Sequence, residues 1–456
     1  MVNFSDLTFI FRFLPVFVIA FYLTPTAYRR WVLLIGSLIF YGVGDFRMLP
    51  VLVGAVVVNY LFASALHTKK NKLLLAFIVC IDALMLIEFK ILGQFVSNSL
   101  MPLGVSFFVF KMISFQADTY RDTIKEEPSF ADVAAYFTMF PQIVSGPIMR
   151  YEFYGDNEAI DRNGDKLELK TILENIEDGL RFFALGLFMK VILADHLSML
   201  WNSIGTIGYE SISTPLAWIG AVTYSLQLYY DFWGYSLMAA GIGVMLGFPF
   251  VVNFDQPYSA KSVSDFYRRW HATLGAWFRD YIYIPLGGSK VGAFRIILNL
   301  LVVWLVTGFW HGVTFNFILW GLVLFAIIVI EKFFVFKVLP KPVGVVLGKF
   351  NVLVLIPLTW VVFAIPDRLM LEDYFCRLFP FFGEGISVNA ADYIKNLGIY
   401  GGFLAAGLVL LIPGLYKLFE KYRKKPVFTV ILLVMLWICI YSLSNSAGNP
   451  FMYFKF

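Results

Sequence analysis

Long runs of apolar residues, separated by short polar segments, form the main pattern along the chain. A helix needs about 20 mostly apolar residues to cross the hydrocarbon core of a bilayer, with about 17 to 25 tolerated. The pattern therefore predicts an all-α, polytopic transmembrane protein. Runs that meet or approach this length lie near 9–24, 31–45, 49–66, 73–90, 101–117, 181–201, 214–250, 294–310, 313–336, 349–365, 398–416 and 426–444.

The first run is expected to be a retained span and not a signal peptide. It contains Arg12, and no small-x-small cleavage site follows it. Two other apolar segments are not expected to form straight helices. The stretch 214–250 is broken near Asp231-Phe-Trp-Gly, and the basic segment 251–293 that follows predicts one net crossing with a bent or re-entrant piece. The piece 131–148 contains prolines and a glycine, which predicts a surface or re-entrant helix.

The composition narrows the class of protein. Of the 456 residues, 59% are hydrophobic and only 15% are charged, and the mean hydropathy is +0.75. A soluble domain carries about a quarter charged residues. A soluble enzyme, a disordered chain, a fibrous repeat and a nucleic-acid-binding domain are therefore excluded. The cysteines Cys80, Cys376 and Cys439 are far apart and form no CxxC pair, which is typical of free core cysteines and predicts no metal site.

The formal net charge of +5 matters through its placement along the chain. Short loops that are rich in Lys and Arg stay in the cytoplasm. Such residues follow the first run at Arg29 and Arg30, the third run at 69–72, and a late run at 417–425. The segment 202–215, in contrast, has no basic residue. We therefore expect the N-terminus outside the cell membrane, with alternate loops facing the cytosol.

His311 is the first candidate for chemistry among the four histidines. It lies between two apolar runs, with Gly308 and Gly312 leaving room for a close approach. A titratable group at membrane depth usually marks a substrate or proton path. A neutral imidazole could take a proton from a hydroxyl group that attacks an acyl carbon. On the residues alone, a histidine that is hydrogen-bonded between helices is the favoured interpretation.

His271 lies in a segment, 266–288, where aromatic residues and arginines alternate at helical spacing. Arginines among Trp and Tyr suit an anionic cofactor or the lipid headgroup layer. The alternative is an interfacial amphipathic helix without a ligand. The sequence Gly287-Gly288-Ser289-Lys290 does not match a Walker motif and predicts a turn. Asp231, at the end of a span, is expected on the residues alone to be structural.

Several motifs along the chain resemble the membrane-bound O-acyltransferase family, in particular its bacterial alginate O-acetyltransferase branch. The two histidine motifs carry most of this resemblance. The motifs are Arg268-Arg-Trp-His271, Trp277-Phe-Arg-Asp-Tyr-Ile-Tyr-Ile-Pro-Leu-Gly-Gly288, Thr307-Gly-Phe-Trp-His-Gly312, Phe315-Asn-Phe-Ile-Leu-Trp-Gly321, and similar stretches at 101–108, 140–150, 230–236 and 450–456.

The resemblance implies a fold and a set of site residues. The implied fold is a ring of about 11–13 tilted helices around a funnel and tunnel. It would form one membrane domain over 1–456, with a catalytic core at about 101–340 and peripheral helices at 1–100 and 341–456. His311 matches the family's invariant catalytic histidine, and His271 matches a second polar position. The implied substrate-binding candidates are Trp270, Arg279, Trp310, Asn316 and Asp231.

The resemblance also implies transfer of an acyl group, most simply acetyl, to hydroxyls of an extracellular or periplasmic glycan. His311 would act as general base or acyl relay, and His271 would orient it or polarise the thioester. The donor would be acetyl-CoA or another acyl thioester, a substrate and not a bound cofactor. The implied setting is a bacterial cytoplasmic membrane and its lipid, with an SGNH-type or glycan-assembly protein as a partner and no nucleic acid. Trp233 and Leu237 depart from the expected motif, which leaves the acceptor open.

Two alternatives stay open at this point. The first keeps the chemistry and changes the substrates, with D-alanine passing from a carrier protein toward teichoic acid. The second belongs to another class of protein, a polysaccharide transporter or flippase without acyl chemistry. Replacement of His311 distinguishes a flippase from an acyltransferase. A flippase does not need this side chain for chemistry and would keep its transport activity.

Overall fold

The computed structural model describes residues 3–144, 146–160, 167–382 and 387–445. Within these residues the chain is helical throughout and forms no β-strand, apart from one isolated bridge between Phe254 and Trp270. The prediction of an all-α protein is confirmed for the described part. The motif at 450–456 and residue 145 of the motif at 140–150 lie outside the described residues.

Two compact units share the chain, and each is discontinuous in sequence. Among the described residues, unit 1 comprises 3–144, 146–160, 167–187, 235–252 and 431–445, and unit 2 comprises 188–234, 253–382 and 387–430. Two helices pass from unit 2 into unit 1, namely α11 (Thr214–Met245) and α22 (Pro426–Asn445).

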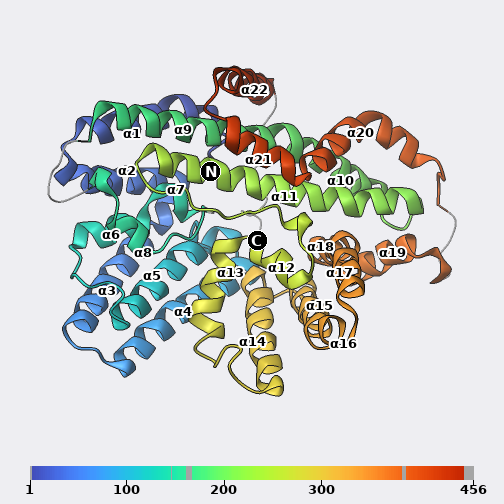
Figure 1. Ribbon diagram of the computed structural model, residues 1–456, viewed down its shortest axis with the longest axis horizontal. Helices are drawn as coiled ribbons and strands as arrows, with labels where there is room; N and C mark the ends of the chain where they lie inside the picture. The colour runs from blue at the N-terminus through green and yellow to red at the C-terminus, as the bar shows by residue number, and fades with distance from the viewer. Residues whose placement is uncertain (1–2, 145, 161–166, 383–386, 446–456) are drawn as a thin grey trace. The chain divides into compact units, whose positions relative to one another are not determined.

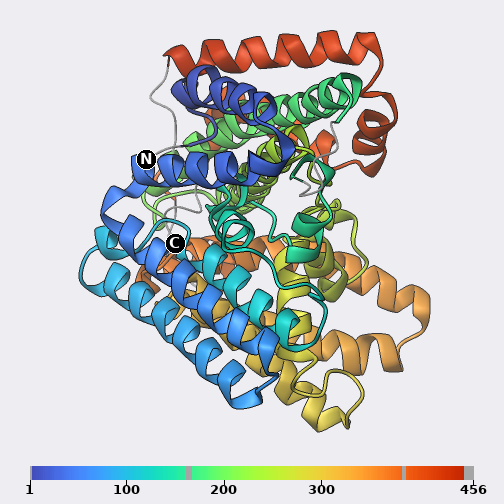
Figure 2. The same cartoon turned by 90° about the vertical axis from the view of Figure 1, so that its left-hand side faces the viewer.

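Unit 1 is built mainly from the first nine α-helices. Helix α5 packs against α3 and α4, and α2 packs against α6 (Figures 1 and 2). Buried polar contacts join these helices, among them an ion pair of Arg30 with Asp132 at 3.0 Å. The helices are α1 (Leu14–Leu23), α2 (Thr26–Asp45), α3 (Leu49–Thr68), α4 (Lys72–Phe95), α5 (Val105–Tyr120), α6 (Phe130–Thr138), α7 (Phe140–Ile143), α8 (Tyr151–Gly155) and α9 (Leu169–Phe188).

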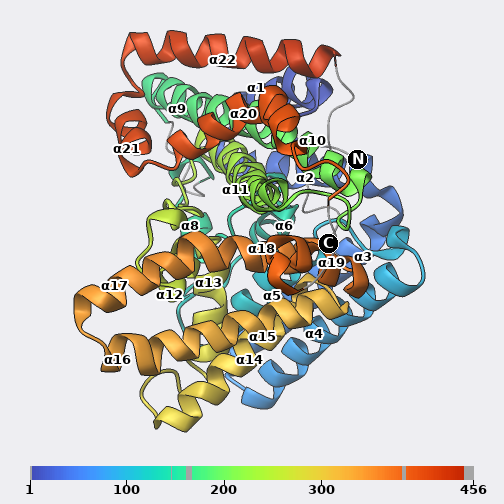
Figure 3. The ribbon, with the colours of Figure 1, turned by 90° about the vertical axis from the view of Figure 1, so that its right-hand side faces the viewer.

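Unit 2 contains the helices that follow α9. Helix α15 packs against α14 and α18, and α20 packs against α10 (Figure 3). The helices are α10 (Asp195–Ile207), α12 (Val263–Arg269), α13 (Ala272–Phe278), α14 (Ala293–His311), α15 (Phe315–Ile330), α16 (Phe336–Val338), α17 (Lys341–Phe350), α18 (Ile356–Ala364), α19 (Arg368–Leu378), α20 (Asp392–Leu410) and α21 (Pro413–Tyr422).

Several of these helices are connected or extended by short π-helical or 3-10 turns. The π-helical turns are Phe9–Phe13, Met189–Ala194, Arg279–Tyr283, Glu331–Val335 and Asn351–Leu355, and the 3-10 turns are Phe46–Met48, Asn98–Leu100, Glu158–Ile160, Pro257–Ser259 and Pro380–Phe382. Side chains cap several helix starts in the expected way. The carboxamide of Asn71 accepts from the first backbone N–H groups of α4, and the Ser262 hydroxyl accepts from the backbone N–H of Asp265 in α12.

Eight helical stretches within the described residues are long and apolar enough to cross a membrane, which confirms a polytopic helical membrane protein. The ring of about 11–13 helices around a funnel stays a prediction. The stretches are Thr26–Thr68, Asn98–Tyr120, Leu169–Ile207, Ala293–His311, Phe315–Val338, Lys341–Ala364, Asp392–Leu410 and Pro426–Asn445.

The expected break near Asp231 is wrong, because α11 runs without interruption from Thr214 to Met245. The helix is buried along most of its length, including its polar residues Gln227, Asp231 and Ser236. The Asp231 carboxylate needs no break in the backbone, since the Lys190 ammonium lies 2.9 Å from it.

Two further expectations need correction. The surface alternative for 131–148 is wrong, because residues 131–143 are buried and lie in α6 and α7, with the break at Met139. The re-entrant alternative stays a prediction. Arg29 and Arg30 are not loop charges, since both are buried in the first turn of α2. The segment 266–288 is also not one helix, as described below.

Candidate active site

A cavity of about 640 Å³ lies within unit 2 and contains the two histidines singled out in the sequence. Its walls come from α11, the α12–α13 segment, α14, α15 and α18. Aromatic rings predominate on these walls, and basic side chains are the other conspicuous group. The lining residues used below are Phe232, Tyr267, Arg268, Trp270, His271, Arg279, Trp304, His311, Trp320, Lys332, Trp360 and Phe363.

His271 reaches the cavity because the chain changes direction between α12 and α13. It adopts a left-handed conformation with φ 46° and ψ 52°, which ends one helix and starts the next. Two backbone hydrogen bonds pair this segment with the preceding extended stretch. The N–H of Asp255 donates to the Arg269 carbonyl at 3.0 Å, and the N–H of Ala272 donates to the Asn253 carbonyl at 2.8 Å. The helical spacing of residues 266–288 gives no sign of this turn.

The imidazole of His271 is 4% exposed and edge-packed against Phe232, with ring centroids 4.7 Å apart. Its Nδ1 lies 3.1 Å from Oδ1 of Asn253. Burial lowers the pKa of His271 to about 3. The ring is therefore neutral near neutral pH and can form hydrogen bonds without a formal charge.

His311 is the last residue of α14 and is half-buried on the cavity wall. Aromatic rings surround it, with centroid distances of 4.4 Å to Trp310, 4.9 Å to Phe363 and 5.2 Å to Trp320. These rings restrict the imidazole on one wall of the cavity. Such apolar surroundings strengthen the electrostatic interactions of a group that they cover.

The close approach of α14 and α15 sets the place of His311. A Cβ atom on Gly308 would lie 2.6 Å from the Phe317 carbonyl oxygen, and one on Gly321 would lie 2.6 Å from the Trp304 carbonyl oxygen. Real Cβ atoms do not come this near to backbone oxygens, so both positions require glycine at this helix separation. The sequence analysis had marked Gly308 for close approach, and the geometry gives the reason.

An aromatic wall faces the histidines and consists of Tyr267, Trp270, Trp304, Trp320 and Trp360. Trp320 stacks on Trp360 at 5.6 Å, and Trp360 lies 5.0 Å from Trp270. The Tyr267 hydroxyl and the Trp320 Nε1 are buried and have no hydrogen-bond partner among the described residues. Because buried polar atoms are normally hydrogen-bonded, these two indicate a site that is completed by a ligand or by water.

Basic residues form part of the cavity wall, namely Arg268, Arg279 and Lys332, and no acidic residue of the described chain lines it. The side chains of Arg268 and Arg279 are 76% and 63% exposed. Each of the two also pairs with an acidic neighbour, Arg268 with Asp265 and Arg279 with Asp280, so part of their positive charge is neutralised within the protein.

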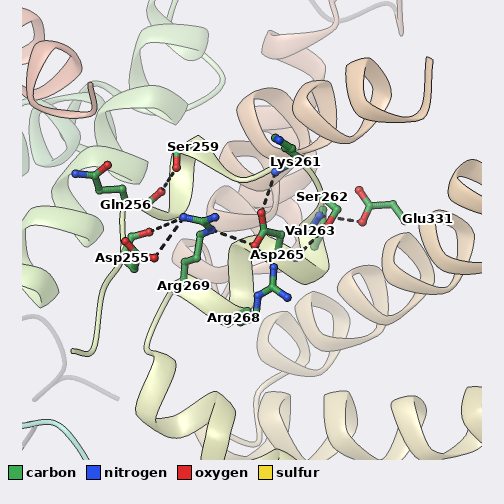
Figure 4. A network of polar contacts seen from close by, with 10 residues as sticks. All are labelled: Asp255, Gln256, Ser259, Lys261, Ser262, Val263, Asp265, Arg268, Arg269 and Glu331. Atoms are coloured by element: carbon green, nitrogen blue, oxygen red, sulfur yellow. Dashed lines mark hydrogen bonds and ion pairs between the residues drawn. The ribbon is translucent and has the colours of Figure 1, made fainter. Parts of the chain in front are cut away.

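A polar network fixes the α12 helix that carries Arg268 (Figure 4). Asp265 accepts hydrogen bonds from both Arg268 and Arg269, and these bonds, against the effect of burial, lower the pKa of Asp265. The Glu331 carboxylate accepts from the Val263 N–H at 2.8 Å and so ties α12 to the end of α15. The network therefore holds the segment just before His271 against the rest of unit 2.

The structure brings together some of the predicted site residues and separates others. Trp270 and Arg279 line the cavity with the two histidines. Trp310 is not among the lining residues, although its ring lies 6.4 Å from that of His271. Asn316 donates to the Phe363 carbonyl at 2.8 Å and so joins α15 to α18. Asp231 faces Lys190, and neither it nor Asn316 lines the cavity.

Sequence reasoning missed several residues of this site. Asn253 lies in the loop before α12, and Trp360 and Phe363 lie on α18, far along the chain from either histidine. Periodicity shows only that the last two belong to an apolar helix. The four-residue stretch Asn253-Phe-Asp-Gln256 precedes a proline in a polar loop, which is a weak signal for a turn and carries no indication of a partner for His271.

Comparison with known proteins shows which sequences this chain is similar to. The sequence model of the membrane-bound O-acyltransferase family matches residues 55–343. A probable alginate O-acetylase of Pseudomonas putida is 30% identical over 99% of this chain and 100% of its own length. A peptidoglycan O-acetyltransferase of Helicobacter pylori is 33% identical over 70% of this chain and 68% of its own. A teichoic acid D-alanyltransferase of Streptococcus thermophilus is 28% identical over 48% of this chain and 54% of its own.

Proposed function

The chain belongs to the membrane-bound O-acyltransferase family, and on that premise we propose that it transfers acetyl groups to hydroxyls of an extracellular or periplasmic polysaccharide. The acetyl group and the polysaccharide are supported by the relatives named for alginate and peptidoglycan O-acetylation, which match 99% and 70% of the chain. The match to a D-alanyltransferase covers 48% of the chain, so D-alanyl transfer ranks second.

The observation that carries this proposal is the joint placement of His271 and His311 on one cavity. Acyl transfer from a thioester needs a base near the attacking hydroxyl and a site that keeps water from competing as the acceptor. His311 supplies the imidazole, and the aromatic wall with Phe363 limits the entry of water.

In the direct route, the acceptor hydroxyl attacks the acyl carbonyl carbon while His311 takes its proton. The new C–O bond forms, the C–S bond breaks, and the proton passes from the imidazolium to the leaving thiolate. In the relay route, the imidazole first forms an acyl-imidazole and releases the thiol, and the hydroxyl then takes the acyl group. Both routes place His311 in contact with the reacting carbon or its nucleophile.

The donor in this proposal is an acyl thioester that carries negative charge, such as acetyl-CoA. Arg268, Arg279 and Lys332 support this, since cations at the cavity wall match phosphate groups. Trp270 would contact the donor or the acyl group within the cavity. The donor is a substrate, and no permanently bound cofactor is part of the proposal.

The proposed setting is the cytoplasmic membrane of a bacterium. Donor would enter from the cytoplasmic side and acceptor from outside, through a funnel and tunnel within a ring of tilted helices. The core of this single domain would lie at about 101–340, with peripheral helices on both sides in sequence. A separate outward-facing SGNH-type or glycan-assembly protein would complete delivery to the polymer.

The test is a comparison of His311→Ala with His67→Ala. His67 lies at the end of α3, in unit 1, outside the cavity. We expect His311→Ala to abolish incorporation of radiolabelled acetyl groups into cell-surface polysaccharide while the protein stays folded and inserted, and His67→Ala to retain it. Removal of a general base typically costs about 10²- to 10⁴-fold in rate.

The other functions give different results in the same cells. Unchanged ester content in His311→Ala would contradict acyl transfer by this residue and favour a transporter. Incorporation of D-alanine in place of acetyl would support the second-ranked function, and dependence on a carrier protein would identify its donor.

A further inference from the structure

The carboxamide oxygen of Asn253 lies at the centre of a buried group of hydrogen bonds next to His271. Oδ1 of Asn253 accepts from the Thr273 hydroxyl at 2.8 Å and from the Thr273 backbone N–H at 3.3 Å. The same oxygen lies 3.1 Å from Nδ1 of His271. Asn253 is 3% exposed, so solvent does not compete for these contacts.

The Thr273 contact settles which atom of the carboxamide faces the histidine. A backbone N–H can only donate a hydrogen bond, so the atom opposite must be an oxygen and not the amide nitrogen. A carboxamide oxygen can only accept. Nδ1 of His271 must therefore carry the proton and donate it to Asn253.

This arrangement determines what the other ring nitrogen can do. In a neutral imidazole, protonation of Nδ1 leaves a lone pair on Nε2. Burial lowers the pKa of His271 to about 3, so the ring does not gain a second proton in the working pH range. Nε2 is therefore an acceptor at neutral pH and cannot donate a hydrogen bond.

The backbone supports the same orientation. The Ala272 N–H donates to the Asn253 carbonyl oxygen at 2.8 Å. Asn253 thus contacts the His271 ring through its side chain and the residue after His271 through its main chain. Both contacts fix the position of the imidazole. His271 lines the cavity, and Nε2 is the ring nitrogen that Asn253 does not contact.

We propose that Asn253 is a positioning residue that holds His271 in the Nδ1–H tautomer, so that His271 presents a hydrogen-bond acceptor at Nε2 for the acyl transfer reaction. This inference rests on the proposed function. It separates two roles for His271. An acceptor can orient a hydroxyl or N–H group of a substrate or of His311, but it cannot polarise the thioester carbonyl, which requires a donor.

The tautomer can be measured without any enzyme assay. The chain has 4 histidines, so ¹⁵N-histidine labelling gives few signals, and a His271→Ala sample assigns the one of interest. In the wild-type protein we expect His271 to show a protonated Nδ1 and an unprotonated Nε2 near neutral pH. A protonated Nε2 in the wild type overturns the proposal.

Two substitutions of Asn253 then test the effect on rate. Asn253→Leu removes the acceptor, and we expect loss of the single tautomer and a fall in kcat on the order of 10- to 100-fold with little change in KM, as for loss of one buried hydrogen bond that orients a reacting group. Asn253→Asp keeps an oxygen in place, and we expect it to retain the tautomer and most of kcat near neutral pH. Its carboxylate raises the pKa of His271, so activity should fall at mildly acidic pH, where the wild type is unaffected by this group.

A matched control is Asn396→Leu, which replaces another buried asparagine of unit 2 that donates to the Asp392 carbonyl away from the cavity. It should leave the His271 signal unchanged. Unaltered kcat in a folded Asn253→Leu, or an Asn253→Asp profile identical to that of the wild type, contradicts the proposal. The spectroscopic result stands even if Asn253→Leu fails to fold. Absence of acyl transfer by the wild type, with the expected tautomer present, would instead count against the proposed function.

Discussion

His271 adopts a left-handed backbone conformation, which costs a residue other than glycine on the order of 1 to 3 kcal/mol. Such strain persists only where neighbouring contacts hold the residue in place. Here the Phe254–Trp270 bridge and the hydrogen bond from Ala272 to Asn253 do so on either side. The strained residue belongs to the candidate site, since the left-handed conformation turns the chain so that the His271 side chain lines the cavity.

Burial of His271 also makes the stability of the protein depend on pH. Its pKa is lowered to about 3 in the folded protein, whereas an unfolded histidine has a pKa of about 6.5. Below about pH 6.5 the unfolded chain binds a proton that the folded protein does not bind. The free energy of unfolding therefore falls as the pH drops toward 3, by up to about 1.4 kcal/mol per pH unit for this one group.

The measurement is thermal unfolding in detergent of wild type and His271→Gln near pH 7 and near pH 5. We expect the wild type to lose more of its melting temperature between the two pH values than His271→Gln does. Equal losses in the two proteins would show that His271 does not remain neutral in the fold.

Single residues differ in how far sequence could predict them. His311 and His271 could be predicted because each lies in a distinctive motif. The chain has only four histidines, so each could be compared with the others as a candidate. Asn253, Trp360 and Phe363 could not, because their part in the site arises from tertiary contacts across many residues of chain. Asp231 and Asn316 were expected near substrate, yet one pairs with Lys190 and the other joins α15 to α18.

At the scale of elements, the contact between α14 and α15 determines where His311 lies. Gly308 and Gly321 allow the backbones to approach, and His311 follows Gly308 by one turn of helix. Packing between small residues is a common way for helices to associate in membranes, where apolar burial gives little driving force. The position of the catalytic candidate therefore depends on residues that carry no chemistry.

Gly321→Ala should separate these two helices, because its Cβ would lie 2.6 Å from the Trp304 carbonyl oxygen. Overpacking of this kind typically costs about 1 to 3 kcal/mol. We expect a lower melting temperature and a lower rate of acyl transfer, since His311 moves relative to Trp320 and Phe363. Gly402→Ala in α20 is the control, as no atom lies within 4 Å of its added Cβ. A fully active, equally stable Gly321→Ala would refute this account.

Helices were predicted well where long apolar runs end at polar loops. The runs near 49–66 and 294–310 correspond to α3 and α14 within a few residues. Prediction failed where a local signal competed with tertiary packing. The Asp231-Phe-Trp-Gly234 stretch predicts a break, but α11 is continuous through it, buried on all sides and with Lys190 in contact with Asp231. The pattern of aromatic residues and arginines in 266–288 predicts a helix. The chain instead turns at His271, where its backbone forms hydrogen bonds with the loop at 253–255.

At the scale of the whole molecule, the apolar residues gather in eight candidate membrane spans within the described residues. The positions of Lys and Arg between them predict which loops face the cytosol. The buried positions of Arg29 and Arg30 remove the first pair of loop charges from that argument. The later basic loops still support it. The membrane class could be predicted from composition alone, because too few charged residues exist to cover a soluble surface.

Cysteine labelling tests this orientation in intact cells. Val388 is 84% exposed and precedes the candidate span Asp392–Leu410, whereas Lys424 is exposed and follows it. In a background without Cys80, Cys376 and Cys439, we expect Val388→Cys to react with a membrane-impermeant maleimide and Lys424→Cys to react only after permeabilisation. The reverse pattern would invert the predicted topology, and equal reaction of both would show that α20 does not cross.

The aromatic wall has a consequence beyond the exclusion of water. Trp270, Trp304, Trp320 and Trp360 all line one cavity, and the chain has 11 tryptophans in total. Indole emission depends on the polarity and mobility of its surroundings, so a molecule that enters this cavity alters the light that a large share of the protein's fluorophores emit. The protein thereby carries its own optical reporter of occupancy, which needs no label and can be read in detergent, in nanodiscs or during turnover.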